Sequence, residues 1–277
     1  MNRHTFVPKD PTHGSDEPTG VRTVVCLPTY NESENLESML HALGAVLEPY
    51  DRVLVIDDNS PDGTGELAAR LASKLGFVSV LQRARKEGLG PAYIAGFRQA
   101  LAFGAELIIE MDCDFSHSPA DVPRLIAAAA DADLVLGSRY TAGGGVSDWG
   151  LGRRFISAGG SLYARMVLGI PVRDLTGGFR CYRRAVLERI DLNTVASRGY
   201  AFQIEMAYRA LLSGFRVVEI PITFADREAG RSKMSRSILL EAAWKMPALR
   251  LSALLGHLES HGQVSSGSAG MQKEIQD

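Results

Sequence analysis

Cysteine is scarce in this chain, with only Cys26, Cys113 and Cys181 among 277 residues. The three are far apart, odd in number and in no metal-binding spacing. We therefore expect reduced thiols in a cytoplasmic setting, not a disulfide framework or a zinc site. Apolar runs long enough to span a bilayer are also missing, and the N-terminus lacks the apolar segment of a signal peptide. We expect neither a transmembrane helix nor a signal peptide.

Neither sign of charge is in excess, because 30 Lys and Arg residues stand against 32 Asp and Glu, for a formal net charge of -2. This balance does not suggest nucleic-acid binding. Two nucleotide-binding motifs are missing too. No Gly-x-Gly-x-x-Gly follows the first apolar run, which argues against a Rossmann dinucleotide site, and no Walker loop is present. The hydrophobic content of 45% is that of an ordinary globular protein.

What is present is an alternation of strand-like and helix-like patterns. The predicted strands are 21–27, 53–56, 77–81, 107–111 and 134–136, with predicted helices that include 64–75 and 91–103. Asn31 and Glu34 predict a capping box for the helix between the first two strands. The alternation predicts an α/β fold, with a mostly parallel sheet flanked by helices. Ligands of such sheets bind beyond the carboxyl ends of the strands.

Composition divides the chain into four segments. Residues 1–20 predict a flexible leader, residues 21–234 one α/β domain, and residues 261–277, rich in Ser, Gly and Gln, a disordered tail. Between the domain and the tail, residues 235–260 carry apolar side chains at near-helical spacing with basic residues among them. They predict an amphipathic helical segment, which Pro247 is expected to divide into two helices.

Asp112 and Asp114 stand directly after the buried strand predicted at 107–111. Residues i and i+2 of an extended segment point to the same side, so both carboxylates can face one point. Two converging carboxylates are costly unless a positive charge lies between them, and a divalent cation carrying substrate phosphates meets that need. Other polar clusters follow three more strands, at 28–32, 57–64 and 137–140. Together they predict one binding cleft at this edge of the sheet.

Seven segments of the sequence occur in an order that is specific to one family. They are Pro28 to Glu32, Asp57 to Thr64, Gly88 to Gly90, Met111 to Asp114, Gly137 to Tyr140, Asp174 to Arg180 and Arg227 to Lys233. Across roughly residues 21–240 the chain resembles the inverting family 2 glycosyltransferases with a GT-A (Rossmann-like) fold. Among these it looks like the polyprenol- and dolichol-phosphate mannose synthases.

The resemblance implies transfer of mannose from GDP-mannose to a polyprenyl phosphate, giving a β-linked product. It implies Mg²⁺ or Mn²⁺ at Asp112 and Asp114. The catalytic residues expected from it are Asp112, Asp114, Arg139, Arg227 and Lys233. The residues expected to bind the donor or the acceptor phosphate are Pro28, Tyr30, Glu32, Ile56, Asp58, Asp112, Cys113, Asp114, Arg139, Arg153, Ser157, Asp174, Arg227 and Lys233. The first five of these are expected to hold the nucleoside.

Three of these assignments have physical arguments of their own. An acceptor phosphate placed near a diphosphate needs cations, for which Arg139 and Arg153 are candidates along with the Arg227/Lys233 pair. Arg154 competes with Arg153 for that role, but Ser157 lies one helical turn after Arg153 and shares its face. Asp174 has two open roles, a contact to a sugar hydroxyl or an anchor for the turn at 176–178.

The metal site departs from the pattern of many relatives. They have Gln two residues after the second Asp, where this chain has Ser116. Ser116 or His117 could assist the metal, and water or the donor phosphates could complete its shell equally well.

A polyprenyl phosphate acceptor implies contact with a membrane. We expect a peripheral protein at the cytoplasmic face, with residues 235–260 as an interfacial anchor, as a helix pair packed on the sheet, or attached through an integral-membrane partner. Two rival functions remain: a polyprenyl-phosphate glycosyltransferase that uses a UDP-sugar such as UDP-glucose, and a non-catalytic subunit that binds nucleotide sugars.

Overall fold

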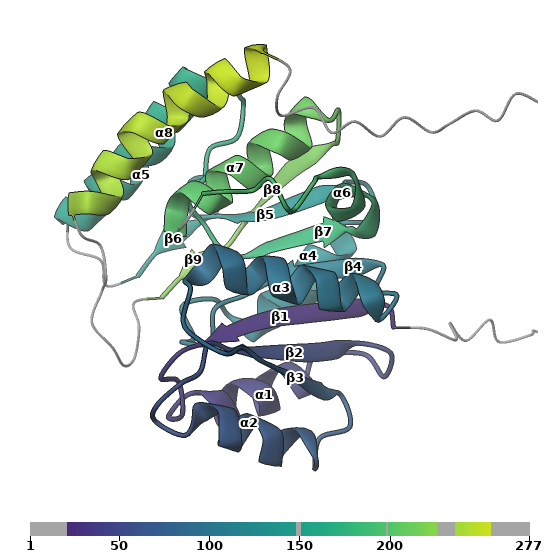
Figure 1. Cartoon of the computed structure of the whole chain (residues 1–277). Coiled ribbons are helices and arrows are strands. Elements are labelled where there is room, and N and C mark those ends of the chain that lie inside the picture. Colours follow the sequence, from purple (N-terminus) through teal and green to yellow (C-terminus); the bar gives the residue numbers. More distant parts are fainter. Residues whose placement is uncertain (1–20, 148–150, 198, 226–235, 256–277) are drawn as a thin grey trace, which may run out of the picture.

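A seven-stranded sheet forms the centre of the computed structural model (Figure 1). The structure describes residues 21–147, 151–197, 199–225 and 236–255, with the backbone alone for 151–156 and 236–243. The strand order is β3-β2-β1-β4-β7-β5-β8, and only β7 is antiparallel to its neighbours. The bounds are β1 Thr23–Thr29, β2 Arg52–Asp57, β3 Val78–Gln82, β4 Leu107–Glu110, β5 Leu134–Ser138, β7 Arg180–Arg183 and β8 Val217–Pro221. A second, two-stranded sheet pairs β6 Gly145–Val146 with β9 Thr223–Phe224.

Alternate residues of the central strands feed two separate cores. In β1, Val24 and Cys26 belong to one core, and Val25 and Leu27 to the other. The first core is covered by α3 Leu89–Ala102, α5 Leu151–Leu168, α6 Arg184–Arg189, α7 Gly199–Leu212 and α8 Arg236–Leu254. The second is covered by α1 Leu36–Gly44, α2 Thr64–Ala72 and α4 Val122–Ala128, the last preceded by the short 3-10 helix Pro119–Asp121. A sheet buried on both faces confirms the predicted α/β class with a mostly parallel sheet.

All five predicted strands form, with ends that differ by a few residues. The strands β6 to β9 and the helices α4, α6 and α7 were not predicted, and of α5 only the helical turn from Arg153 to Ser157 was. The capping box at Asn31 and Glu34 is wrong. Helix α1 begins later, at Leu36, with Asn35 at its N-cap. Asn31 instead takes a left-handed conformation (φ 60°) in the turn after β1, because the chain must bend there before the helix can start.

The prediction that Pro247 divides the C-terminal segment is also wrong. Helix α8 continues through Pro247 and packs along α5 and against α7 (Figure 1). Proline removes one backbone donor from a helix. Here Met246 and Leu249, on either side of it, are buried in the first core, so packing holds both halves in one helix. Of the helices that the structure describes, none is long and apolar enough to cross a membrane.

Candidate active site

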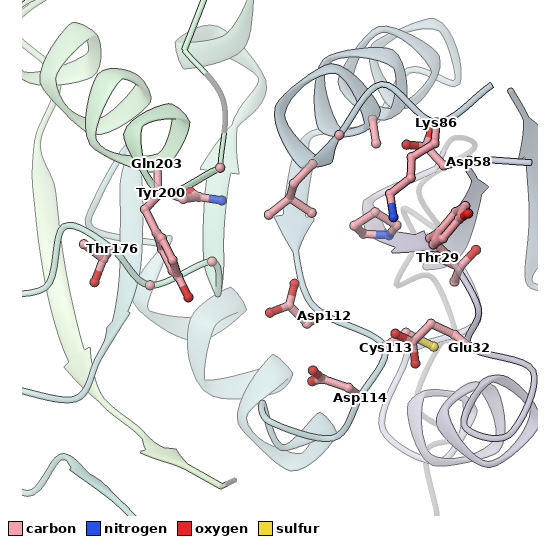
Figure 2. A pocket seen from close by; sticks show the side chains of 18 of the residues that line it. Thr29, Glu32, Asp58, Lys86, Asp112, Cys113, Asp114, Thr176, Tyr200 and Gln203 are labelled. Carbon is pink, nitrogen blue, oxygen red and sulfur yellow. The ribbon is translucent and has the colours of Figure 1, made fainter. Parts of the chain in front are cut away.

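A pocket of about 360 Å³ opens where β1, β2 and β4 reach their carboxyl ends (Figure 2). One side is formed by the loops that follow β1, β2 and β3. The segment after β4 lies in the middle, and the other side consists of residues before β7 and at the start of α7. The predicted residues that line it are Pro28, Tyr30, Glu32, Asp58, Asp112, Cys113, Asp114 and Arg139. The structure therefore brings together the polar clusters that follow four different strands.

Two tight turns shape the first side. Asn31 and Asn59 both have positive φ (60° and 58°), which Asn adopts more readily than most residues. The backbone N–H of Asn31 donates to the Ser60 hydroxyl at 3.1 Å, so the loops after β1 and β2 are tied together. The backbone N–H of Glu32 donates to the Thr64 hydroxyl at 3.0 Å. These contacts fix the turn that carries Glu32 into the pocket.

Charges on this side are arranged around Tyr30 and Asp58. The Lys86 ammonium lies 3.4 Å from the centroid of the Tyr30 ring, a cation–π contact. The Asp58 carboxylate forms an ion pair with Arg83 and accepts the backbone N–H of Glu87 at 3.4 Å. Asp58 is thus held in place while it still lines the pocket.

Ile56 is placed differently from the other residues predicted for the nucleoside. Its side chain is fully buried in the first core, against Gly96 of α3. Gly96 leaves no room for a side chain, because a Cβ there would lie 2.4 Å from Ile56 Cδ1. The Ile56 side chain therefore belongs to the core and does not line the pocket.

The two central carboxylates differ in exposure. The Asp112 side chain is 28% exposed, whereas Asp114 is buried and accepts the Ser116 backbone N–H at 3.1 Å. Between Asp114 and Ser116, Phe115 turns the chain with φ 58°, a conformation that costs energy for a bulky residue. The His117 ring stacks on Phe179, with centroids 5.0 Å apart. The strained turn therefore brings Asp114 back toward the pocket that Asp112 lines.

The residues around this pair suit a cation that takes most of its ligands from elsewhere. In the described part of the chain, no three His, Cys, Asp or Glu side chains are grouped to hold a metal ion. Two carboxylates with the remaining positions left to phosphates and water are the usual protein contribution to a Mg²⁺ site. Asp112 and Asp114, lining one pocket, meet that requirement.

Arg139 and Asp174 form a buried ion pair at the edge of the pocket. Asp174 accepts Nε and Nη2 of Arg139, each at 2.7 Å, and also its backbone N–H at 2.9 Å. Burial alone would raise the pKa of Asp174, but the hydrogen bonds and charge of Arg139 outweigh it and lower the pKa. Asp174 further accepts the Gly177 backbone N–H at 3.2 Å. Of the two roles left open for Asp174, these contacts match that of an anchor for the turn at 176–178.

The segment before β7 reaches the pocket because β7 runs against its neighbours. Residues that precede a parallel strand lie at the edge of the sheet opposite to the pocket. Because β7 is antiparallel, the residues that precede it lie at the same edge as the pocket. Arg180, fully buried in β7, donates to the carbonyls of Leu175, Gly177 and Gln203 at 2.9, 2.9 and 2.6 Å. One guanidinium therefore fixes the segment at 174–178 against α7.

The remaining predicted phosphate contacts are only partly described. Ser157 is buried, and its hydroxyl accepts a hydrogen bond from the Tyr140 hydroxyl at 2.8 Å. Tyr140 directly follows Arg139 in the sequence. For Arg153 the structure describes the backbone in α5 and not the side chain. Arg227 and Lys233 lie outside the described residues. Their roles stay predictions.

Several residues that line the pocket were not among the predicted site residues, and they include Lys86, Thr176, Tyr200, Gln203 and Phe224. Tyr200 and Gln203 belong to α7, whose first residue, Gly199, has φ 53°. One signal was available: Gln203 is a polar residue within the apolar run Ala201 to Ile204. Without the position of α7, that signal does not distinguish a site residue from a core residue with a partner.

Two curated relatives share nearly half of their residues with this chain. The undecaprenyl-phosphate mannosyltransferase of Micrococcus luteus is 48% identical over 222 residues, which cover 80% of this chain and 91% of the relative. The polyprenol monophosphomannose synthase of Mycolicibacterium smegmatis is 48% identical over 227 residues, covering 81% and 85%.

Solved structures with a similar fold are more distant in sequence. Glucosyl-3-phosphoglycerate synthase from Mycobacterium tuberculosis, in complex with Mn²⁺, UDP-glucose and phosphoglyceric acid, is 20% identical. Its TM-score is 0.60, with 88% of this chain and 82% of that chain covered. Its complex with Mn²⁺, UDP and glucosyl-3-phosphoglycerate gives a TM-score of 0.57 at 20% identity, covering 86% and 80%. The model of the family "Glycosyl transferase family 2" matches residues 24–191. With more than half of its length matched, the chain belongs to glycosyl transferase family 2.

Proposed function

We propose that this protein transfers mannose from GDP-mannose to a polyprenyl phosphate, with inversion at the sugar carbon C1. The observation that carries the proposal is the convergence of Asp112, Asp114 and Arg139 on one pocket. It is joined by 48% identity to relatives named for mannosyl transfer to undecaprenyl phosphate and for polyprenol monophosphomannose synthesis.

The carboxylates of Asp112 and Asp114 would hold Mg²⁺ or Mn²⁺ together with the donor diphosphate. The cation would neutralise the charge of that leaving group. Arg139, paired with Asp174, adds a guanidinium of fixed position at the same pocket. Burial works to lower the pKa of its guanidinium, but Asp174 outweighs this and raises the pKa, so Arg139 stays charged at every working pH. Its orientation is set before substrate arrives, which is the arrangement that stabilises developing charge most effectively.

The acceptor needs no strong general base. A phosphate monoester oxygen is already largely ionised at neutral pH and attacks C1 of mannose. The bond from C1 to the diphosphate oxygen breaks, and GDP leaves with the electron pair. The face opposite the leaving group is attacked, so the product has the β configuration. The protein must instead hold two anionic groups close together, and we assign the acceptor phosphate to Arg153, Ser157, Arg227 and Lys233.

We further propose that α5 and α8 rest on the cytoplasmic face of the membrane that holds the acceptor. The two helices pack together, and they expose large apolar side chains: Leu162, Met166, Trp244, Leu251 and Leu254. Over their combined length they carry Arg153, Arg154, Arg165, Arg236, Lys245 and Arg250 against a single acidic residue, Glu241. An apolar surface with an excess of basic residues suits an anionic lipid surface. An integral-membrane partner on this face is the other arrangement that we consider.

The decisive experiment offers radiolabelled GDP-mannose and UDP-glucose separately, with polyprenyl phosphate and Mg²⁺, and measures label in the lipid extract. We expect label from GDP-mannose. Asp114→Asn should lower the rate by about 100-fold or more, because one preorganised electrostatic contact is typically worth that much, and excess EDTA should stop transfer. Asp121→Asn, an Asp that does not line the pocket, is the matched control and should keep full activity. Label only from UDP-glucose would overturn the donor assignment.

A further inference from the structure

One side of the pocket, opposite the loops that follow β1, β2 and β3, has not been assigned a ligand. Thr176, Tyr200 and Gln203 line it, opposite Thr29, Glu32 and Asp58 (Figure 2). We call these three residues the α7 wall. Asp112 lies between the two sides. If the nucleoside occupies the first side and the diphosphate lies at the carboxylates, the sugar extends toward the α7 wall.

Gln203 is the polar residue that this wall buries most completely, with 1% of it exposed. Its amide reaches the pocket because Gly178 stands in front of it: a Cβ on Gly178 would lie 3.5 Å from Gln203 Nε2. Neither atom of this amide, Nε2 or Oε1, has a hydrogen-bond partner among the described residues. An amide has two N–H donors and two acceptor lone pairs, so the hydrogen-bonding capacity of Gln203 is open to a ligand.

The other two members supply hydroxyl groups. Thr176 accepts Nη2 of Arg139 at 2.8 Å, which leaves its own O–H to donate. Tyr200 is half-buried and close enough to Arg139 to influence the guanidinium. An amide and two hydroxyls can each donate and accept, and none of them carries a charge at neutral pH. That is the chemistry of a site for sugar hydroxyls, not for phosphate.

The wall is also rigid. Arg180 holds the carbonyls of both Gly177 and Gln203, so the loop and the helix cannot move apart without breaking buried hydrogen bonds. A recognition site needs its polar groups fixed in this way, because a loosely held group discriminates poorly between similar ligands.

We infer that Gln203, with Thr176 and Tyr200, contacts the hydroxyls of the donor's sugar ring and determines which sugar is transferred. The inference rests on the proposed function. It is physically reasonable because a site that hydrogen-bonds a substrate hydroxyl rejects analogues that lack it far more strongly than an apolar pocket does.

The test is a cycle that combines Gln203→Leu with GDP-mannose and its 2-, 3-, 4- and 6-deoxy analogues. Gln203→Leu should lower kcat/KM for GDP-mannose roughly 10- to 100-fold, as expected for an unsatisfied hydrogen bond in a buried site. For one of the deoxy donors, kcat/KM of the wild type and of the variant should differ by no more than about twofold, because that donor already lacks the hydroxyl that Gln203 contacts. The affinity for GDP, which lacks the transferred mannose, should stay within about twofold. Gln99→Leu, the same change in α3 outside the pocket, is the matched control.

A milder variant guards against a folding defect. Tyr200→Phe removes one hydroxyl from a half-buried ring, and it should likewise remove discrimination at one sugar position. Equal loss on every donor, or a parallel loss of GDP affinity, in both variants would overturn the inference. If wild type uses UDP-glucose and not GDP-mannose, the proposed function fails, and the same cycle with deoxy UDP-glucose donors still decides the role of the wall.

Discussion

Asp174→Asn should destabilise the protein more than any other single loss of charge at the site. In the structure four donors point at the two Asp174 oxygens: Nε, Nη2 and the backbone N–H of Arg139, and the backbone N–H of Gly177. Asparagine keeps one oxygen and turns an NH₂ group toward these donors. It also leaves the Arg139 guanidinium, 5% exposed, without its counter-charge.

The loss of one partner from a buried ion pair costs about 3–5 kcal/mol, a large part of the roughly 5–15 kcal/mol that stabilises a typical domain. Urea unfolding followed by circular dichroism measures it as a lower midpoint at an unchanged slope. Glu188→Gln is the control. It breaks the Arg184–Glu188 pair, in which Glu188 is 50% exposed, and exposed pairs contribute roughly 0–1 kcal/mol.

The same pair predicts a pH dependence with a definite sign. The pKa of Asp174 is lower in the folded protein than in the unfolded chain, so its contribution to stability is complete above the unfolded value of about 3.9. It is lost as the pH falls through the folded value. The difference in stability between wild type and Asp174→Asn should therefore be full at pH 7 and shrink below about pH 4. A difference below about 1 kcal/mol at pH 7, or one that does not change with pH, would refute the reasoning.

Two more predictions follow from the proposed function. Arg227→Ala and Lys233→Ala should lower turnover while the calorimetric affinity for GDP stays near that of wild type, since both are assigned to the acceptor phosphate; weaker GDP binding with normal acceptor dependence would place them in the donor site. Trp244→Ser with Leu251→Ser should weaken binding to anionic vesicles tenfold or more, because each buried side chain contributes about 1.5–3 kcal/mol, yet spare transfer to a short, water-soluble acceptor. Leu212→Ser, an exposed leucine of α7, is the control, and equal loss on both acceptors would contradict a membrane role.

The parts that sequence predicts well are those that depend on neighbouring residues. Each early strand is an apolar run that ends in polar residues, and the carboxyl ends of parallel strands share one edge. The positions of Asp58, Asp112 and Arg139 around one pocket therefore follow from the order of runs and turns alone. The segment Asp174 to Arg180 carried a motif, but its strand could not be predicted from it.

What could not be predicted depends on contacts between distant residues. Strand β7 has only four residues and begins and ends with Arg, so it does not resemble a buried strand. Its Arg180 is tolerated inside because carbonyls from two other segments accept its hydrogen bonds. The role of Asp174 was undecided for the same reason, since its partner Arg139 lies 35 residues earlier. Gln203 lines the pocket only because α7 packs beside the loop at 174–178.

Strand β7 is also the only bridge between two parts of the sheet. On one side of it lie β3, β2, β1 and β4, which follow one another along the chain; on the other lie β5 and β8. During synthesis the first four strands can pair as soon as they are made. Strand β5 is made next, but its link to that group, β7, is added more than forty residues later. The side of the pocket formed by the loops after β1, β2 and β3 can thus form early in folding, whereas Arg139 and the loop before β7 take their places only when that one short strand is inserted.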